Sequence, residues 1–324
     1  MKKTINLLLI MAIVAILQSC RPMPKTSTTS GMMTIMCDNS FENIMQQEID
    51  VYEFQYPEAF IIPYYIPQQD AIDSLLALKT NTIVIARDLT KNERAKLKNK
   101  NQTVYSEMIA VDALALIVNP VNTIEEMTVA EIGDILAGEI TDWNDLAPSD
   151  LGTIDVVFDH NGSSTMQYMR DSLMNGRQFG KNVYVQDSIE GVFEIVSHNK
   201  NAMGIIGVSW ITADMRSREL STEQLVEISK DMNAEMNDYE YDSDIKVLAV
   251  SPSDQYRPRK PYQSYIYSGE YPLFRQIYMI TTGARGGVDN GFFSFVTSVN
   301  GQKLMMRTGV LPAVIYPQVI ELTR

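Results

Sequence analysis

The chain has 324 residues, 45% of them hydrophobic, and its 40 acidic side chains outnumber 27 basic ones to give a formal charge of −13. This length and apolar content suffice for about two globular domains, each with its own core. A surface this acidic repels nucleic acid and anionic membranes. We therefore expect no nucleic-acid partner.

The N-terminus has the pattern of an export signal over residues 1–19. Two lysines, Lys2 and Lys3, precede an apolar run at residues 7–17 that is too short to favour a membrane-spanning helix. The sequence Leu-Gln-Ser-Cys that ends at Cys20 resembles the bacterial lipobox, in which the cysteine is lipidated. An ordinary secretory peptide followed by a chance cysteine is the alternative. We expect lipidation of Cys20 and a flexible tether at residues 20–31, which anchor an exported protein to a membrane in the periplasm or cell envelope.

Short β runs alternate with helical patterns in the first part of the mature chain. Strands are predicted at residues 32–37, 60–66 and 82–86, and two prolines place the second toward a sheet edge. A helical pattern follows each strand, and Thr90 with Glu93 forms a capping box that opens the third helix. This order is typical of a parallel sheet covered by helices.

A second α/β block follows. Residues 104–118 contain two apolar runs separated by Asp112, and a second capping box at Thr128 and Glu131 opens a helix. The remaining predicted elements are strands at residues 154–158, 203–208 and 273–282, and helices at residues 164–174, 192–198, 222–233 and 292–306.

Motifs for catalysis are missing from the sequence. His160 and His198 lack the spacing of a metal site, and there is no nucleophile elbow, phosphate-binding Walker loop or dinucleotide fingerprint. Asp159 and His160 are neighbours on a strand, so their side chains point to opposite faces. We therefore predict no enzyme activity, no metal and no cofactor.

Polar residues follow several predicted strands, at the edge where open α/β sheets bind ligands. They include Ser40, Gln69, Arg87 and the loop at residues 162–165. That loop precedes a helix, whose first N–H groups and macrodipole can hold an anion. Each residue also has an ordinary explanation, because the serines cap helices, Gln69 can face solvent and Arg87 can pair with a surface carboxylate.

A series of motifs then narrows the interpretation. The motifs are residues 112–119, residues 128–138 with the sequence TVAEIGDILAG, residues 140–143, the Gly-Ser-x-Thr loop at 162–165, residues 203–207 and residues 295–309. In sequence and in order along the chain, these motifs resemble those of the phosphate-binding lipoproteins and periplasmic proteins that feed ABC-type phosphate importers.

The resemblance implies a type II periplasmic binding protein fold, with two α/β lobes joined by two crossing hinge strands near residues 110–113 and 278–282. Lobe 1 would comprise residues 32–111 and 281–324, and lobe 2 residues 112–280. The implied protein is a monomer that captures phosphate or a similar oxyanion between its lobes and delivers it to ABC permease subunits.

The resemblance also implies site residues. Ser40 and Phe41 correspond to a Thr-Phe pair that supplies a hydroxyl and a backbone N–H, and Gln69 lies about where a second helix offers a serine. Ser163, Ser164 and Thr165 correspond to the family's Ser-Gly-Thr loop.

Two positions depart from the family pattern. Asp159 stands where the family has an arginine, and Ala86 stands where it has an aspartate that accepts a proton from hydrogen phosphate. Arg87 is our candidate for restoring a guanidinium contact. An accessory interaction lipoprotein that keeps the fold but has altered or lost anion binding remains the alternative.

Overall fold

The structure is a computed structural model that describes residues 26–211, 221–230, 244–283 and 286–314. The predicted signal peptide, Cys20 and the start of the tether lie outside these ranges. None of the helices within them has the length and apolar character needed to cross a membrane.

In the described ranges, ten strands form one continuous sheet. Its main path is β2 (Glu58–Ile66), β1 (Ser30–Asp38), β3 (Thr82–Ile85), β11 (Phe274–Thr281), β4 (Tyr105–Val118), β8 (Ala202–Gly207), β6 (Asp155–Phe158) and β7 (Val183–Val185). Short strands β9 (Lys246–Val247) and β12 (Leu311–Pro312) also pair with β4, and β5 (Glu126–Thr128) pairs separately with β10 (Ala249–Ser251). The proline-containing strand β2 lies at the sheet edge, as predicted.

Strands β4 and β11 occupy the middle of the sheet and connect its two sides. β4 pairs with β11 over residues 105–113 and with β8 over residues 114–118. Asp112 therefore interrupts an apolar sequence without interrupting the strand. The predicted parallel pairing of the first three strands is confirmed, because β1 runs parallel to both β2 and β3. β11 runs antiparallel to both β3 and β4. The hinge crossings that we predict near residues 110–113 and 278–282 lie on β4 and β11. The lobe boundaries themselves stay a prediction.

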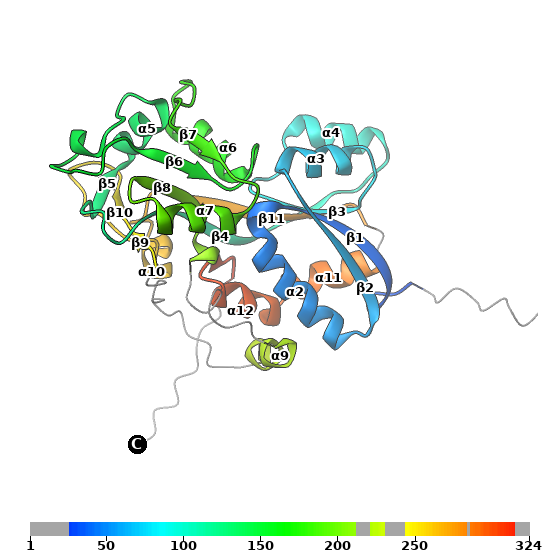
Figure 1. Ribbon diagram of the computed structural model, residues 1–324. Helices are drawn as coiled ribbons and strands as arrows, with labels where there is room; N and C mark the ends of the chain where they lie inside the picture. The colour runs from blue at the N-terminus through cyan, green and yellow to red at the C-terminus, as the bar shows by residue number, and fades with distance from the viewer. Residues whose placement is uncertain (1–25, 212–220, 231–243, 284–285, 315–324) are drawn as a thin grey trace, which may run out of the picture.

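Helices cover both faces of the sheet (Figure 1). Around β1–β3, α3 (Gln68–Leu76) and α4 (Lys91–Asn99) lie on one side, and α2 (Glu42–Gln55) and α11 (Val288–Val296) on the other. The remaining helices are α5 (Val129–Ala137), α6 (Ser164–Leu173), α7 (Ile189–His198), α9 (Thr222–Lys230), α10 (Gln263–Tyr267) and α12 (Val299–Arg307), with short 3₁₀ turns η1 (Asn39–Phe41), η2 (Trp143–Asp145) and η3 (Val208–Trp210).

The local end signals behave as the sequence indicates. Both bonds of each predicted capping box are present, at Thr90 for α4 and at Thr128 for α5. The last long helix is instead two helices, because Ser298 caps α12 by accepting a hydrogen bond from the Gly301 N–H. Cys37 is fully buried in the core, where burial raises the pKa of its thiol.

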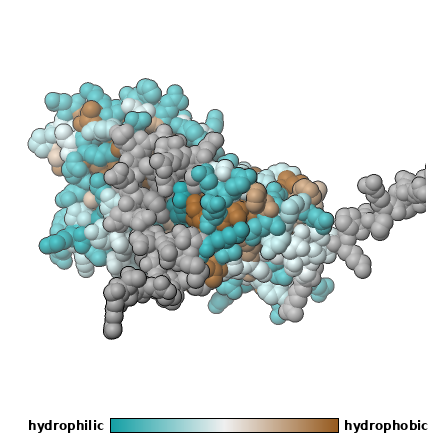
Figure 2. All heavy atoms as spheres, turned by 90° about the horizontal axis from the view of Figure 1, so that it is seen from below, coloured by the Kyte–Doolittle hydropathy of each residue, from teal (hydrophilic) through white to brown (hydrophobic). Residues whose placement is uncertain are grey.

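The lower surface, formed by α2, α9 and α12, is hydrophilic over much of its described area and has a limited exposed hydrophobic area near its middle (Figure 2).

Candidate functional site

A buried arginine lies at the centre of the polar cluster. Arg275 is on β11, directly across the strand pair from Asp112 on β4, and their side chains are 2% and 0% exposed. The Arg275 Nε and Nη2 atoms donate to Asp112 Oδ2 over 3.1 and 3.0 Å. Its guanidinium also lies 4.7 Å from the ring centroid of Phe41, as in a cation–π contact. The cluster therefore takes its positive charge from Arg275 on the central strand β11.

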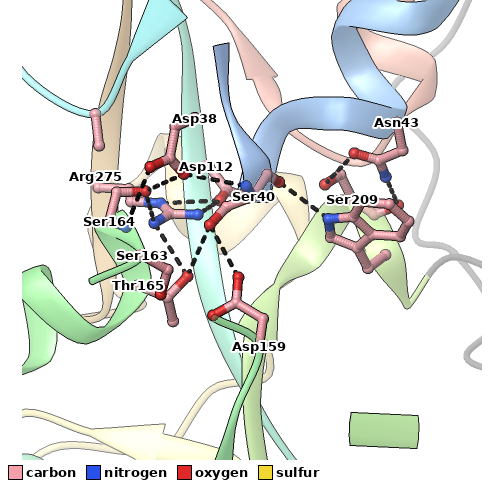
Figure 3. Close-up of polar contacts among 12 residues, drawn as sticks. Asp38, Ser40, Asn43, Asp112, Asp159, Ser163, Ser164, Thr165, Ser209 and Arg275 are labelled. Atoms are coloured by element: carbon pink, nitrogen blue, oxygen red, sulfur yellow. Dashed lines mark hydrogen bonds and ion pairs between the residues drawn. The ribbon is translucent and has the colours of Figure 1, made fainter. Parts of the chain in front are cut away.

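The remaining guanidinium nitrogen reaches the start of α6. Arg275 Nη1 donates to Ser164 Oγ over 2.6 Å and to Thr165 Oγ1 over 3.2 Å. Ser164 Oγ in turn donates to Asp38 Oδ1 over 2.7 Å. Asp38 is the last residue of β1, so this chain of bonds joins strands and helices from opposite sides of the sheet (Figure 3).

Ser40 completes the cluster from η1. Its hydroxyl donates to Asp159 Oδ2 over 3.1 Å and lies 3.3 Å from Thr165 Oγ1, while its backbone N–H donates to Asp38 Oδ1 over 3.0 Å. Figure 3 shows these side chains pointing toward one another around Arg275. The cluster is thus built from the ends of β1 and β6, the start of α6, and the central strands.

Further hydrogen bonds tie the same elements together. The Gln68 amide donates to Gln167 on α6, and its carbonyl oxygen accepts from the Ala86 N–H over 2.7 Å. Beside the cluster, the Trp210 indole donates to the Ser40 carbonyl over 3.0 Å, and Asn43 donates to the Ser209 carbonyl over 2.9 Å. These bonds fix η1 and α2 against the end of β8.

Three buried carboxylates, Asp38, Asp112 and Asp159, share the cluster with one guanidinium. Burial raises the pKa of Asp38 and of Asp112, and the charge of Arg275 only partly offsets that effect. Burial acts in the same direction on Asp159, but its neighbours His160 and Ser163 outweigh it and lower the pKa, with His160 Nδ1 lying 3.7 Å from Asp159 Oδ2. Asp112 Oδ1 and Asp159 Oδ1 are buried without hydrogen-bond partners. The cluster therefore has more acceptors than donors.

Five of the predicted site residues lie together in this cluster. Ser40, Phe41, Ser163, Ser164 and Thr165 are each at most 1% exposed. Ser163 caps α6, since its hydroxyl accepts from the Met166 N–H over 3.3 Å. The ordinary explanation of this loop, a helix cap, is therefore confirmed for Ser163, and anion binding by the loop stays a prediction.

Gln69 and Arg87 lie outside the cluster. Gln69 donates to Asp73 one turn along α3, and its neighbour Gln68 faces α6 instead. Arg87 donates from Nη1 and Nη2 to the two carboxylate oxygens of Glu93 over 2.9 and 2.8 Å. Glu93 is the capping-box residue of α4, so a local acceptor holds the guanidinium that we expected at the anion site.

Sequence reasoning missed Arg275 and Asp38. Arg275 carried a usable signal, because it is a single charge within an apolar strand pattern, as Asp112 is in another. Asp38 directly follows the predicted strand at residues 32–37, two residues before Ser40. In the described part of the chain, no group of three or more His, Cys, Asp or Glu side chains could hold a metal ion.

Comparison with known proteins gives a consistent set of relatives. A family model described as a PBP superfamily domain matches residues 24–300. The phosphate-binding protein PstS of Pseudomonas aeruginosa is 22% identical over 304 residues, which is 89% of this chain and 85% of that protein.

Two solved structures are also similar. The first is a candidate phosphate ABC transporter substrate-binding protein from Clostridium perfringens, solved with bound phosphate. It has a TM-score of 0.67 and 19% identity over 88% of this chain and all of that one. The second, an ABC-type phosphate transport receptor from Vibrio cholerae, has a TM-score of 0.63 and 21% identity over 86% and 99% of the two chains. At these identities the structural matches establish the fold.

Proposed function

Because the chain belongs to the PBP superfamily, and its fold confirms the expected type II periplasmic binding architecture, we propose that it is a phosphate-capturing solute-binding protein of an ABC importer. It binds phosphate or a similar tetrahedral oxyanion and delivers it to the permease without chemical change. Its relatives support this hypothesis, since they are named as a phosphate-binding protein and a phosphate transport receptor.

One observation in particular supports the proposal. One buried guanidinium donates to two hydroxyls at the start of α6 and lies against the Phe41 ring of η1. Hydroxyls, helix N-terminal N–H groups and a guanidinium are the donors that proteins use for oxyanions. The charged pair lies on β4 and β11, the two strands on which we predict the hinge crossings, so an anion held there would lie between the two proposed lobes.

Calorimetric titration of the mature chain with phosphate, sulfate and arsenate tests the proposal. We expect micromolar or tighter binding of phosphate, and weaker binding after Thr165→Val, which keeps the side-chain shape but removes the hydroxyl. Ser149→Ala, in a loop away from the cluster, is the matched control. Absence of binding to all three anions below millimolar concentration refutes the proposal and favours the accessory-lipoprotein alternative.

We further propose that Cys20 is lipidated and holds the protein, as a monomer, at a membrane of the cell envelope. The lipobox-like sequence before Cys20 supports this placement. Metabolic labelling with a fatty-acid analogue should mark the wild-type protein, and Cys20→Ser should abolish the label and release the protein into the soluble fraction. Labelling that persists in Cys20→Ser contradicts the assignment.

A further inference from the structure

The anion-binding donors of the cluster are already occupied by a carboxylate of the protein itself. Asp38 Oδ1 accepts from the Ser40 N–H over 3.0 Å and from the Ser164 hydroxyl over 2.7 Å. Asp38 Oδ2 accepts from the Ser164 N–H, in the first turn of α6, over 3.3 Å. A carboxylate at a helix N-terminus takes the place that a phosphate or sulfate would fill.

We propose that Asp38 is a built-in competitor for the anion, seated in the site until the ligand displaces it. This inference rests on the proposed function, and it assigns to Asp38 the control of affinity at the same site. The ligand and Asp38 need the same donors, namely the Ser40 N–H, the Ser164 N–H and the Ser164 hydroxyl. Asp38 and a bound anion cannot accept hydrogen bonds from these three donors at the same time.

Asp38 differs in this respect from the other two buried carboxylates. Asp112 accepts only from Arg275 among the side chains, and it faces the central strands and not the start of α6. Asp159 accepts the Ser40 hydroxyl but takes no N–H of α6. Only Asp38 receives both a hydroxyl and an N–H from the first residue of that helix.

The position of Asp38 makes displacement feasible. It is the last residue of β1 and lies next to η1, so its side chain is held by the hydrogen-bond donors around it. Its carboxylate has two oxygens. A tetrahedral anion has four and can accept from the same three donors while also receiving Arg275, which now reaches Asp38 only through the Ser164 hydroxyl. The larger number of acceptor atoms favours the ligand over Asp38.

A competitor multiplies the association constant of the ligand by the fraction of molecules whose site it leaves free. If Asp38 is seated in about nine molecules of ten, phosphate binds about tenfold more weakly than to the empty site. Removal of the competitor should therefore strengthen phosphate binding, whereas removal of a residue that helps to hold the ligand should weaken it. The sign of the change distinguishes the two roles.

The test compares Asp38→Asn and Asp38→Ala with Asp159→Asn in calorimetric titrations with inorganic phosphate. Asp159→Asn is the matched control, because it removes the same charge from an equally buried carboxylate that does not occupy the start of α6. We expect both Asp38 variants to bind phosphate at least about tenfold more tightly than the wild type. Asp159→Asn should show a clearly smaller gain, which measures the effect of charge alone.

A crystal structure of the phosphate complex provides the second measurement. We expect phosphate oxygens on the Ser40 and Ser164 N–H groups and the Asp38 side chain turned away from both. Equal gains in the Asp38 and Asp159 variants, a loss in the Asp38 variants, or a bound phosphate with Asp38 still in place overturns the inference and leaves the proposed function standing. If neither the wild type nor any variant binds an oxyanion, the proposed function itself fails.

Discussion

Replacement of Arg275 by methionine tests whether the buried guanidinium holds the cluster together. The substitution keeps much of the side-chain volume but leaves Asp112 buried without its partner, and it removes the donor that orients Ser164 and Thr165. Loss of one member of a buried ion pair typically costs about 3–5 kcal/mol of unfolding free energy. We expect a loss in this range for Arg275→Met in urea unfolding.

Arg87→Met is the matched control, because it also removes one arginine from an ion pair. The side chain of Arg87 is 35% exposed, against 2% for Arg275. Pairs exposed to solvent contribute about 0–1 kcal/mol, so the control should lose no more than that. In the double variant Arg275→Met/Asp112→Asn, part of the loss should return, since no charge is then buried alone at that position.

The pH dependence of the Arg275→Met loss adds an independent check. Arg275 provides the two largest effects that lower the pKa of Asp112, so its removal raises the folded-state pKa further above the unfolded value near 3.8. A carboxyl group with a raised folded pKa stabilises the fold at low pH and loses that contribution as pH rises through the folded pKa. The gap between wild type and Arg275→Met should therefore be smallest near pH 4 and widen toward neutral pH. A gap that is constant with pH, or as small as the Arg87→Met gap, would refute this reasoning.

Three further predictions concern stability. Glu48 is buried with no hydrogen-bond partner for either carboxylate oxygen, and burial raises its pKa well above 4.5. The free energy of unfolding of the wild type should therefore fall above pH 4.5, by up to about 1.4 kcal/mol per pH unit. Thermal melts at pH 5 and pH 8 should show that Glu48→Met removes this pH dependence. Thr128→Ala removes the cap of α5 and should cost about 1 kcal/mol in urea unfolding, whereas Thr123→Ala at a nearby exposed position should cost almost nothing. Gly291→Ala would place a Cβ 2.0 Å from the Thr28 carbonyl oxygen and should lower the free energy of unfolding by about 1–3 kcal/mol; an unchanged denaturation midpoint would show that the Thr28 backbone can move away.

The features that the sequence predicts well are those whose cause lies within a few residues. A capping box needs only Thr90 and Glu93, or Thr128 and Glu131, and both boxes form as expected. Pro63 lies in β2, and β2 is an edge strand. The start of α6 also follows from local signals, because Ser163 caps the helix from the loop in which the motif places it.

The predictions that depend on side-chain direction are less successful. Gln68 and Gln69 are adjacent on a helix and point in directions about 100° apart, so an assignment displaced by one residue selects the wrong amide. For Arg87, the competing acceptor Glu93 was itself recognised in the sequence as a capping residue, but a capping box does not reveal that its carboxylate also binds an arginine three residues before the cap. Choosing between two possible partners of a long side chain requires the tertiary structure.

Arg275 shows what a non-local pairing adds. Asp112 and Arg275 are 163 residues apart in the chain, and each looks like a defect in an apolar strand when read alone. Once β4 and β11 pair in antiparallel register, the two residues stand opposite each other and each supplies the charge that makes the other tolerable in the core. The resemblance implies a guanidinium at the end of β6, where Asp159 stands, and we predicted Arg87 as its replacement. In the buried cluster the guanidinium comes from the central strand β11. If the cluster binds the anion as proposed, a substitution at Arg275 should change anion affinity and stability together.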